Sequence, residues 1–120
     1  MKIFAALLLL TVTPATAADL TGTWSGSFKP EGGEHDIPQL VTLKQQGSAL
    51  SGSAGPNAGE QYPIENGSVN GSKASFQVTT GEWKFTYNLT ADGDVLAGDL
   101  KLESPTESRT AKVRLTRTKN

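Results

Sequence analysis

Apolar and polar side chains alternate along most of this 120-residue chain with a period of two, the pattern of β-strands that bury one face. The clearest run is Glu82–Thr90, where Trp83, Phe85, Tyr87 and Leu89 alternate with polar residues. Eight such runs occur, and none has the 3.6-residue spacing of an amphipathic helix. The predicted strands are Thr21–Lys29, Gln39–Gln46, Ala49–Ala54, Gln61–Ser68, Lys73–Thr79, Glu82–Thr90, Val95–Glu103 and Arg109–Thr118.

Short turns separate most of these runs. Gly47-Ser48, Asn70-Gly71 and Asp92-Gly93-Asp94 have the composition of hairpin turns, and Gly81 marks another. Asn66-Gly67 either ends its strand or forms a bulge within it. Consecutive hairpins produce an up-and-down meander, and eight antiparallel strands can close on themselves. We therefore predict an all-β fold, a single eight-stranded antiparallel up-and-down β-barrel.

Two connections are longer than tight turns, Pro30–Pro38 and Gly55–Glu60. Because alternate connections of a meander lie at the same end, these two should share one mouth with Thr80–Gly81 and Ser104–Glu107. The mouth of a β-barrel is a preferred place for a small-molecule site. A ligand is therefore expected at this end.

The N-terminus has the organisation of a signal peptide. Lys2 supplies a positive charge, Ile3–Leu10 is apolar, and Ala15-Thr16-Ala17 is an A-x-A cleavage pattern. As a helix, the apolar run would span about 12 Å, against about 30 Å of hydrocarbon, so no membrane anchor is expected. Residues 1–17 are predicted to be the signal peptide and residues 18–120 the barrel domain, which is expected to be secreted or periplasmic.

Composition narrows the possible partners. The chain has no cysteine, which excludes disulfides although the expected compartment would permit them. Its net charge of −1 predicts no long-range attraction to nucleic acid or to an anionic membrane. The C-terminal strand is locally basic, with Lys112 and Arg114 on the face opposite Val113 and Leu115. That face is either a solvated surface or a docking patch for an acidic partner.

The pair Gly22-x-Trp24 in the first predicted strand resembles the signature of the calycins, the group of lipocalins, fatty-acid-binding proteins and avidins. In those families the Trp packs across the closed end of the barrel, under a basic side chain from the last strand. Arg117 has the matching phase here, and a guanidinium over an indole contributes about 0.5–2 kcal/mol. The resemblance implies structural roles for Gly22, Trp24 and Arg117.

Leu20-Thr21-Gly22-Thr23-Trp24 is similar to avidins in particular. However, Gly26 and Pro30 stand where avidins carry the Asn and Ser that hold biotin, so biotin binding is not expected. The segment from Gly22 through Phe76 also resembles small secreted bacterial β-domains, which occur alone or attached to extracellular hydrolases. That second resemblance implies the β-fold and a secreted location, but it implies no catalytic or binding chemistry.

Candidate catalytic and metal-binding groups are sparse. His35, the single histidine, lies between Glu34 and Asp36, but adjacent side chains on a loop diverge, and a structural zinc site draws four ligands. Asp92 and Asp94 flank Gly93 in a turn too short for a calcium loop. We therefore expect no enzyme activity, no metal and no cofactor.

The leading functional hypothesis is a binding domain that holds a small apolar or mixed ligand at the barrel mouth. The predicted contact residues are Phe28, Tyr62, Trp83 and Tyr87, chosen for their inward phase and aromatic character. Whether the interior is filled or hollow stays open, because an eight-stranded barrel is just wide enough for side chains or one small ligand. A monomer is expected.

The alternative is a protein–protein module, either an inhibitor of an extracellular hydrolase or an accessory domain for one. The predicted partner-binding loop is Gly-rich and acidic, and it comprises Gly32, Gly33, Glu34, His35 and Asp36. A protein partner in the extracellular space would then replace the small ligand.

Overall fold

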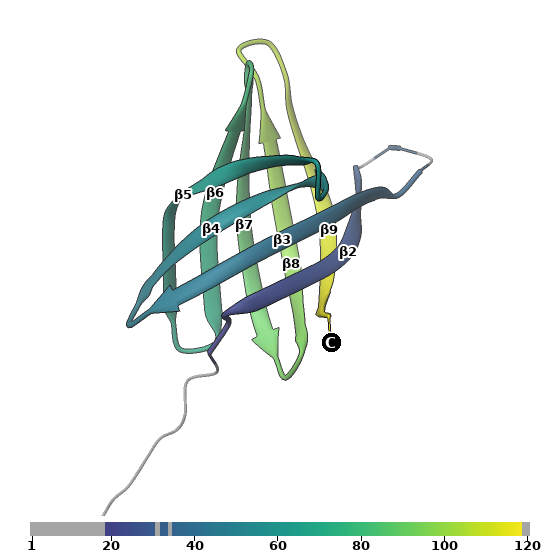
Figure 1. The fold of residues 1–120 in the computed structure, drawn as a ribbon. Coiled ribbons are helices and arrows are strands. Elements are labelled where there is room, and N and C mark those ends of the chain that lie inside the picture. Colours follow the sequence, from purple (N-terminus) through teal and green to yellow (C-terminus); the bar gives the residue numbers. More distant parts are fainter. Residues whose placement is uncertain (1–18, 31, 34, 119–120) are drawn as a thin grey trace, which may run out of the picture.

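A computed structural model describes residues 19–30, 32–33 and 35–118 as a closed barrel of eight antiparallel strands (Figure 1). Each strand pairs with its neighbour in sequence, and the last strand pairs with the first, which confirms the predicted up-and-down topology. The strands are β2 (Gly22–Pro30), β3 (Ile37–Gln46), β4 (Ala49–Asn57), β5 (Glu60–Asn70), β6 (Lys73–Thr80), β7 (Trp83–Asp92), β8 (Val95–Glu103) and β9 (Ser108–Arg117). The predicted signal peptide, residues 1–17, lies outside the described residues. Over the described ranges, no helix is long and apolar enough to cross a membrane.

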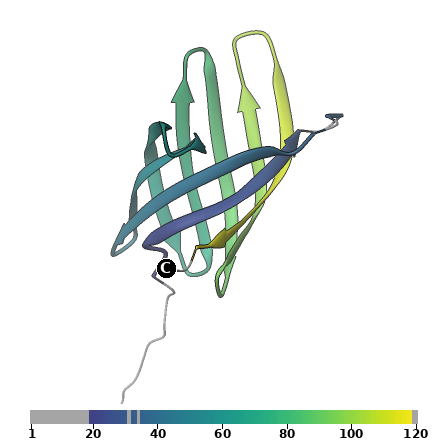
Figure 2. The same cartoon turned by 45° about the vertical axis from the view of Figure 1, so that its right-hand side comes forward.

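The connections divide between two ends of the barrel (Figure 2). One end holds the β3–β4, β5–β6 and β7–β8 turns together with the start of β2 and the end of β9; we call it the closed end. The other end holds the β2–β3, β4–β5, β6–β7 and β8–β9 connections; we call it the mouth. The four connections that were expected to share one end therefore do so.

One predicted loop is shorter than expected. The sequence predicts a longer connection over Gly55–Glu60, but β4 runs to Asn57 and β5 begins at Glu60. A Cβ atom at Gly55 would lie 1.8 Å from the carbonyl oxygen of Glu60, so the two backbones approach each other more closely than any other residue would allow. Glycine thus extends this strand pair rather than ending it.

The Asn66-Gly67 signal corresponds to a bulge inside β5 and does not end the strand. Asn66 has a φ of 52°, and the register with β6 shifts between Glu65 and Ser68. The Asn66 side-chain amide donates a hydrogen bond to the Gln77 side chain at 2.8 Å, which fixes the bulge against β6.

Side chains fill the interior of the barrel. Phe76 and Tyr87 stack with ring centroids 4.5 Å apart, and the Tyr87 hydroxyl donates a 2.5 Å hydrogen bond to Oε1 of the buried Gln39. Burying each large apolar side chain stabilises the fold by about 1.5–3 kcal/mol. The largest fully buried side chains are Trp24, Tyr87, Phe76, Leu20, Leu43, Leu89, Leu96, Leu100, Leu115 and Val41.

The closed end is sealed by Trp24 and Arg117. Trp24 is fully buried, and its indole N–H donates to the Leu20 carbonyl at 3.0 Å. The Arg117 guanidinium carbon lies 4.4 Å from the indole centroid, in the arrangement that the calycin resemblance implies. Gly22 makes room for it, because a Cβ there would lie 3.2 Å from Nη1 of Arg117.

Candidate functional site

The mouth contains an apolar cavity of about 270 Å³, which we call the mouth slot. It exists because the strands end at different heights. The last residue of β2, Pro30, pairs with Ala111, so the first residues of β9 extend beyond β2. The β6–β7 and β8–β9 hairpins therefore project past the β2–β3 pair (Figure 2). Trp83 and Phe85, on the inner side of β7, are accordingly only partly buried. The slot is lined by Pro30, Ile37, Trp83, Phe85, Leu102, Glu107 and Arg109.

The chemistry of the mouth slot is apolar with one charged pair. Phe85 and Leu102 are direct neighbours on β7 and β8, and Trp83 lies nearer the tip of its hairpin. Ile37 is 37% exposed although it is a large hydrophobic residue. Nη2 of Arg109 lies 3.1 Å from Oε2 of Glu107, so the cation in the slot is paired. Such a lining suits an apolar ligand or one with a single polar end.

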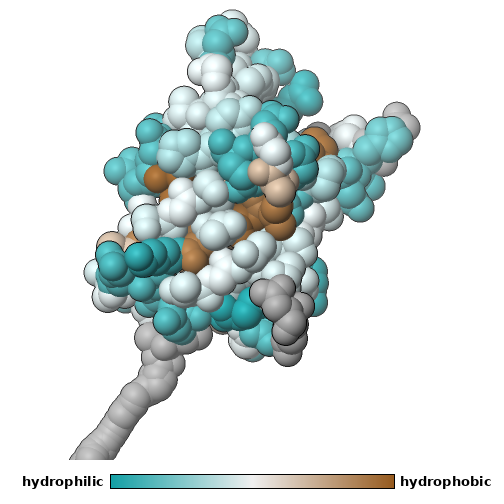
Figure 3. All heavy atoms as spheres, viewed as in Figure 1, coloured by the Kyte–Doolittle hydropathy of each residue, from teal (hydrophilic) through white to brown (hydrophobic). Residues whose placement is uncertain are grey.

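Hydrophobic atoms are otherwise scattered on the visible surface. On the face seen in Figure 3, brown apolar atoms form separate patches among pale and teal residues. Small isolated patches are ordinary on a protein surface, so this face carries no broad apolar interaction surface. A concave site with a defined lining is therefore more informative than surface hydrophobicity here.

The structure separates the four predicted ligand contacts. Trp83 lines the mouth slot, whereas Phe28 and Tyr87 are only 3% and 2% exposed and belong to the core. Tyr62 is half-buried against the core, and its hydroxyl donates to Glu60 at 2.6 Å. That hydrogen bond to a carboxylate raises the pKa of Tyr62.

The sequence placed Pro30, Ile37 and Glu107 in connections at the mouth, but it did not assign Phe85, Leu102 or Arg109 to the ligand contacts. Phe85 and Leu102 have the inward phase of their strands, and Arg109 has the same phase as Ala111 and Val113. Alternation alone could therefore have placed Arg109 on the inner face. The stagger that places these residues around the slot depends on the β2–β9 register and has no signal in a single strand.

The predicted partner-binding loop lies beside the slot. Gly32, Gly33, His35 and Asp36 are exposed, and Glu34 falls outside the described residues. The Gly33 amide donates to the Pro30 carbonyl at 2.8 Å, which tightens the start of the loop. Among the residues that the structure describes, no group of three or more His, Asp or Glu side chains is placed to hold a metal ion.

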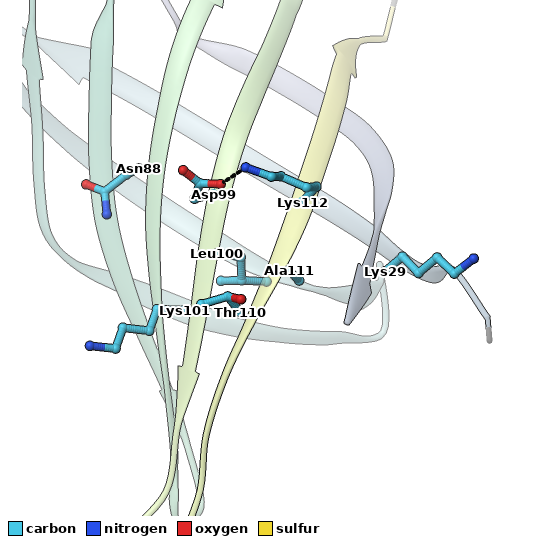
Figure 4. A pocket seen from close by; sticks show the side chains of 8 residues that line it. All are labelled: Lys29, Asn88, Asp99, Leu100, Lys101, Thr110, Ala111 and Lys112. Carbon is cyan, nitrogen blue, oxygen red and sulfur yellow. Dashed lines mark hydrogen bonds and ion pairs between the residues drawn. The ribbon is translucent and has the colours of Figure 1, made fainter. Parts of the chain in front are cut away.

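A larger hollow, of about 620 Å³, lies on the outer surface across β7, β8, β9 and the end of β2 (Figure 4). An ion pair between Lys112 and Asp99 lies at its centre, with Asn88 beside it. Lys29 and Lys101 extend from its two sides in Figure 4. The sequence indicated the exposed basic face around Lys112, but it did not indicate that lysines from β2 and β8 join it.

Comparison of the chain with models of known protein families, with curated proteins and with solved structures finds no match. The geometry of the mouth slot and of the hollow around Lys112 is therefore the basis for assigning a function.

Proposed function

We propose that this chain is an exported, non-enzymatic binding domain of the calycin type that holds a small apolar or mixed ligand in the mouth slot. The observation that carries the proposal is the partly exposed apolar surface of Trp83 and Phe85, which lines the slot together with Ile37 and the buried Leu102 above a filled interior. Export is supported by the charged, apolar and A-x-A segments of residues 1–17. The calycin assignment is supported by Trp24 packed under Arg117.

The dimensions of the slot favour a small ligand or one end of a longer one. At about 270 Å³ it lies just below the usual range of ligand pockets, roughly 300–1,000 Å³. Because the core beneath is occupied by Phe28 and Tyr87, a ligand would lie across the mouth and not enter the barrel. Apolar contact is expected to supply most of the affinity, at about 25 cal/mol per Å² buried.

The test is a titration with N-phenyl-1-naphthylamine, a neutral apolar fluorophore, together with native mass spectrometry of the protein from its own host. Trp83→Ala and Phe85→Ala should each weaken binding of the fluorophore by tenfold or more. Leu40→Ala is the matched control, because Leu40 is a partly exposed apolar residue on the outer side of β3. Equal affinities for the parent, both slot variants and this control would refute the slot as the binding site.

A second candidate function is supported by the loop at the same end. The loop beside Ile37 is exposed at Gly32, Gly33, His35 and Asp36. A protein partner that binds this loop would be able to insert a side chain into the slot. Such a partner would be an extracellular hydrolase or another exported protein. Deleting Gly32–Asp36 should abolish co-purification of this partner while circular dichroism stays that of the parent. A partner retained by the deletion variant would exclude the loop.

A further inference from the structure

Charge is unevenly distributed around the barrel. The outer side of β6–β9 and the adjoining end of β2, which we call the lateral face, is cationic although the whole chain has a net charge of −1. Three carboxylates, Asp92, Asp99 and Glu103, lie on this face. The cations on it are Lys29, Lys73, Lys84, Lys101, Lys112 and Arg114. Many of the remaining acidic residues lie in connections or at the barrel ends, including Asp19, Asp36, Glu60, Glu82, Asp94 and Glu107.

The strand register orders this face into rows. One row crosses five strands as direct neighbours, Ser75, Asn88, Asp99, Lys112 and Lys29. Adjacent strands are about 4.8 Å apart, so the row presents one polar group for each step of about that length. This step is close to the length of one pyranose ring in a linear polysaccharide. The neighbouring row, Thr86, Lys101 and Thr110, continues the mixture of hydroxyl and ammonium groups.

The lateral face is also hollowed along this row. The hollow of about 620 Å³ is joined by a second one of about 410 Å³, and the two share Asn88 and Asp99. Together they form a groove from Ser68 on β5 to Lys29 on β2. Its lining combines hydroxyl, carboxylate and ammonium groups and the amides of Asn70 and Asn88 with the aliphatic residues Ala74, Leu89, Leu100 and Ala111, and it has no aromatic side chain.

The charges in the groove are accessible to a ligand. The side chains of Lys112 and Asp99 are 86% and 65% exposed. An exposed ion pair contributes only about 0–1 kcal/mol, so Lys112 can turn to a ligand anion at little cost. Lys29, Lys84 and Arg114 form no ion pair with any of the residues that the structure describes.

We propose that this groove binds an extended acidic polysaccharide. Its carboxylate or sulfate groups would pair with Lys29, Lys101 and Lys112, and its ring hydroxyls would hydrogen-bond to Ser75 and Asn88. The inference rests on the outer surface alone and is independent of the ligand proposed for the mouth slot.

Other macromolecules fit the groove less well. An extended peptide gains affinity by adding to a free sheet edge, and each strand of this closed barrel already has two partners. Single-stranded nucleic acid is held largely by base stacking on aromatic side chains, and the aromatic residues of β6 and β7 have the inward phase. A groove rich in hydroxyl and amide groups between cations suits a sugar polymer better than either.

The test is affinity electrophoresis with polygalacturonate, using the same polymer fully methyl-esterified as the uncharged control. At about 50 mM salt, Lys29→Gln and Lys112→Gln should each weaken binding of polygalacturonate fivefold or more. Lys44→Gln makes the same charge change on the exposed outer side of β3, outside the groove, and should change binding by less than twofold. Lys112→Arg should retain binding. These are exposed side chains, so all variants are expected to fold.

Further polymers separate the possible outcomes. Dextran sulfate that binds more tightly than polygalacturonate, with the same response to Lys112→Gln, would identify sulfate as the preferred group and support the proposal. Equal binding of the methyl-esterified polymer, or equal losses in the Lys44→Gln variant, would overturn it. Poly-aspartate or single-stranded DNA that binds as tightly as both acidic polysaccharides would also overturn it, because it would show attraction to any polyanion.

Discussion

Trp24 and Arg117 are direct neighbours across the β2–β9 seam, with the guanidinium carbon 4.4 Å from the indole centroid. This seam joins the first strand to the last and so closes the barrel. Arg117 also pairs with Asp94 at 2.9 Å and donates to the carbonyls of Thr21 and Asp19 at 2.7 and 3.1 Å. One side chain thus ties the start of the domain to its end and to the β7–β8 turn.

Replacing Arg117 should therefore destabilise the closed barrel. Arg117→Met keeps an apolar stem but loses the cation–π contact, of about 0.5–2 kcal/mol, and the bonds to both backbone carbonyls. We expect the free energy of unfolding to fall by about 2.5–4 kcal/mol, since each of the two hydrogen bonds contributes roughly 1 kcal/mol in addition to the cation–π contact. Urea unfolding followed by tryptophan fluorescence measures it. Arg114→Met, exposed on the same strand, is the control and should stay within about 0.5 kcal/mol of the parent; equal losses would contradict the role of Arg117.

Gly26 should be intolerant of a side chain, because β2 and β9 meet too closely there. A Cβ on Gly26 would lie 1.9 Å from the carbonyl oxygen of Arg114, which is backbone and cannot move without breaking the seam. We expect Gly26→Ala to cost about 2 kcal/mol or more, comparable to overpacking a core. Gly59→Ala is the control, because its nearest contact would be 3.4 Å from a side-chain oxygen. A Gly26→Ala protein as stable as the Gly59→Ala protein would show that the seam can open.

Much of the fold is predictable from the alternation of apolar and polar residues. The exceptions lie at glycines, where the composition indicates a turn but the strand continues. The runs around Trp83–Leu89 and Leu96–Leu102 alternate cleanly because one face meets the core and the other meets solvent. Gly55 is a turn signal by composition but continues β4 in the structure, because its missing Cβ allows the backbone of Glu60 to approach. Composition does not distinguish a glycine that turns the chain from one that lets two strands touch.

The candidate sites were less predictable from the sequence, since whether a residue belongs to a site depends on its position along the barrel axis. Trp83 and Tyr87 have the same phase on β7, yet Trp83 lines the mouth slot and Tyr87 is buried. What separates them is where β2 ends relative to β9, a long-range register. Similarly, Lys29 and Lys112 are far apart in sequence and become neighbours only when the barrel closes.

The buried pair of Gln39 and Tyr87 should be strongly coupled. Tyr87→Phe leaves Oε1 of Gln39 without its 2.5 Å donor in the core, and Gln39→Met leaves the Tyr87 hydroxyl without its acceptor. Each single variant should lose about 1–3 kcal/mol, the usual cost of an unsatisfied buried polar group. The double variant should lose about 1 kcal/mol less than the sum, as measured by a double-mutant cycle in urea. Strict additivity would mean that the two groups do not interact.

Stability should fall at alkaline pH because burial raises the pKa of the Tyr87 hydroxyl above its ordinary value of 10.0. Above about pH 10 the unfolded chain releases this proton while the folded barrel retains it. The contribution of the protonated Tyr87 hydroxyl to the free energy of unfolding is therefore complete below pH 10. It is lost as pH rises toward the folded-state pKa, by at most about 1.4 kcal/mol per pH unit. Urea midpoints at pH 9 and pH 11 should fall more steeply for the parent than for Tyr87→Phe. Tyr62→Phe, which removes the other of the two tyrosines, keeps the buried hydroxyl and should retain most of the parent's alkaline loss. Parallel pH profiles for the parent and Tyr87→Phe would show that solvent reaches the Tyr87 hydroxyl and that the barrel interior is open.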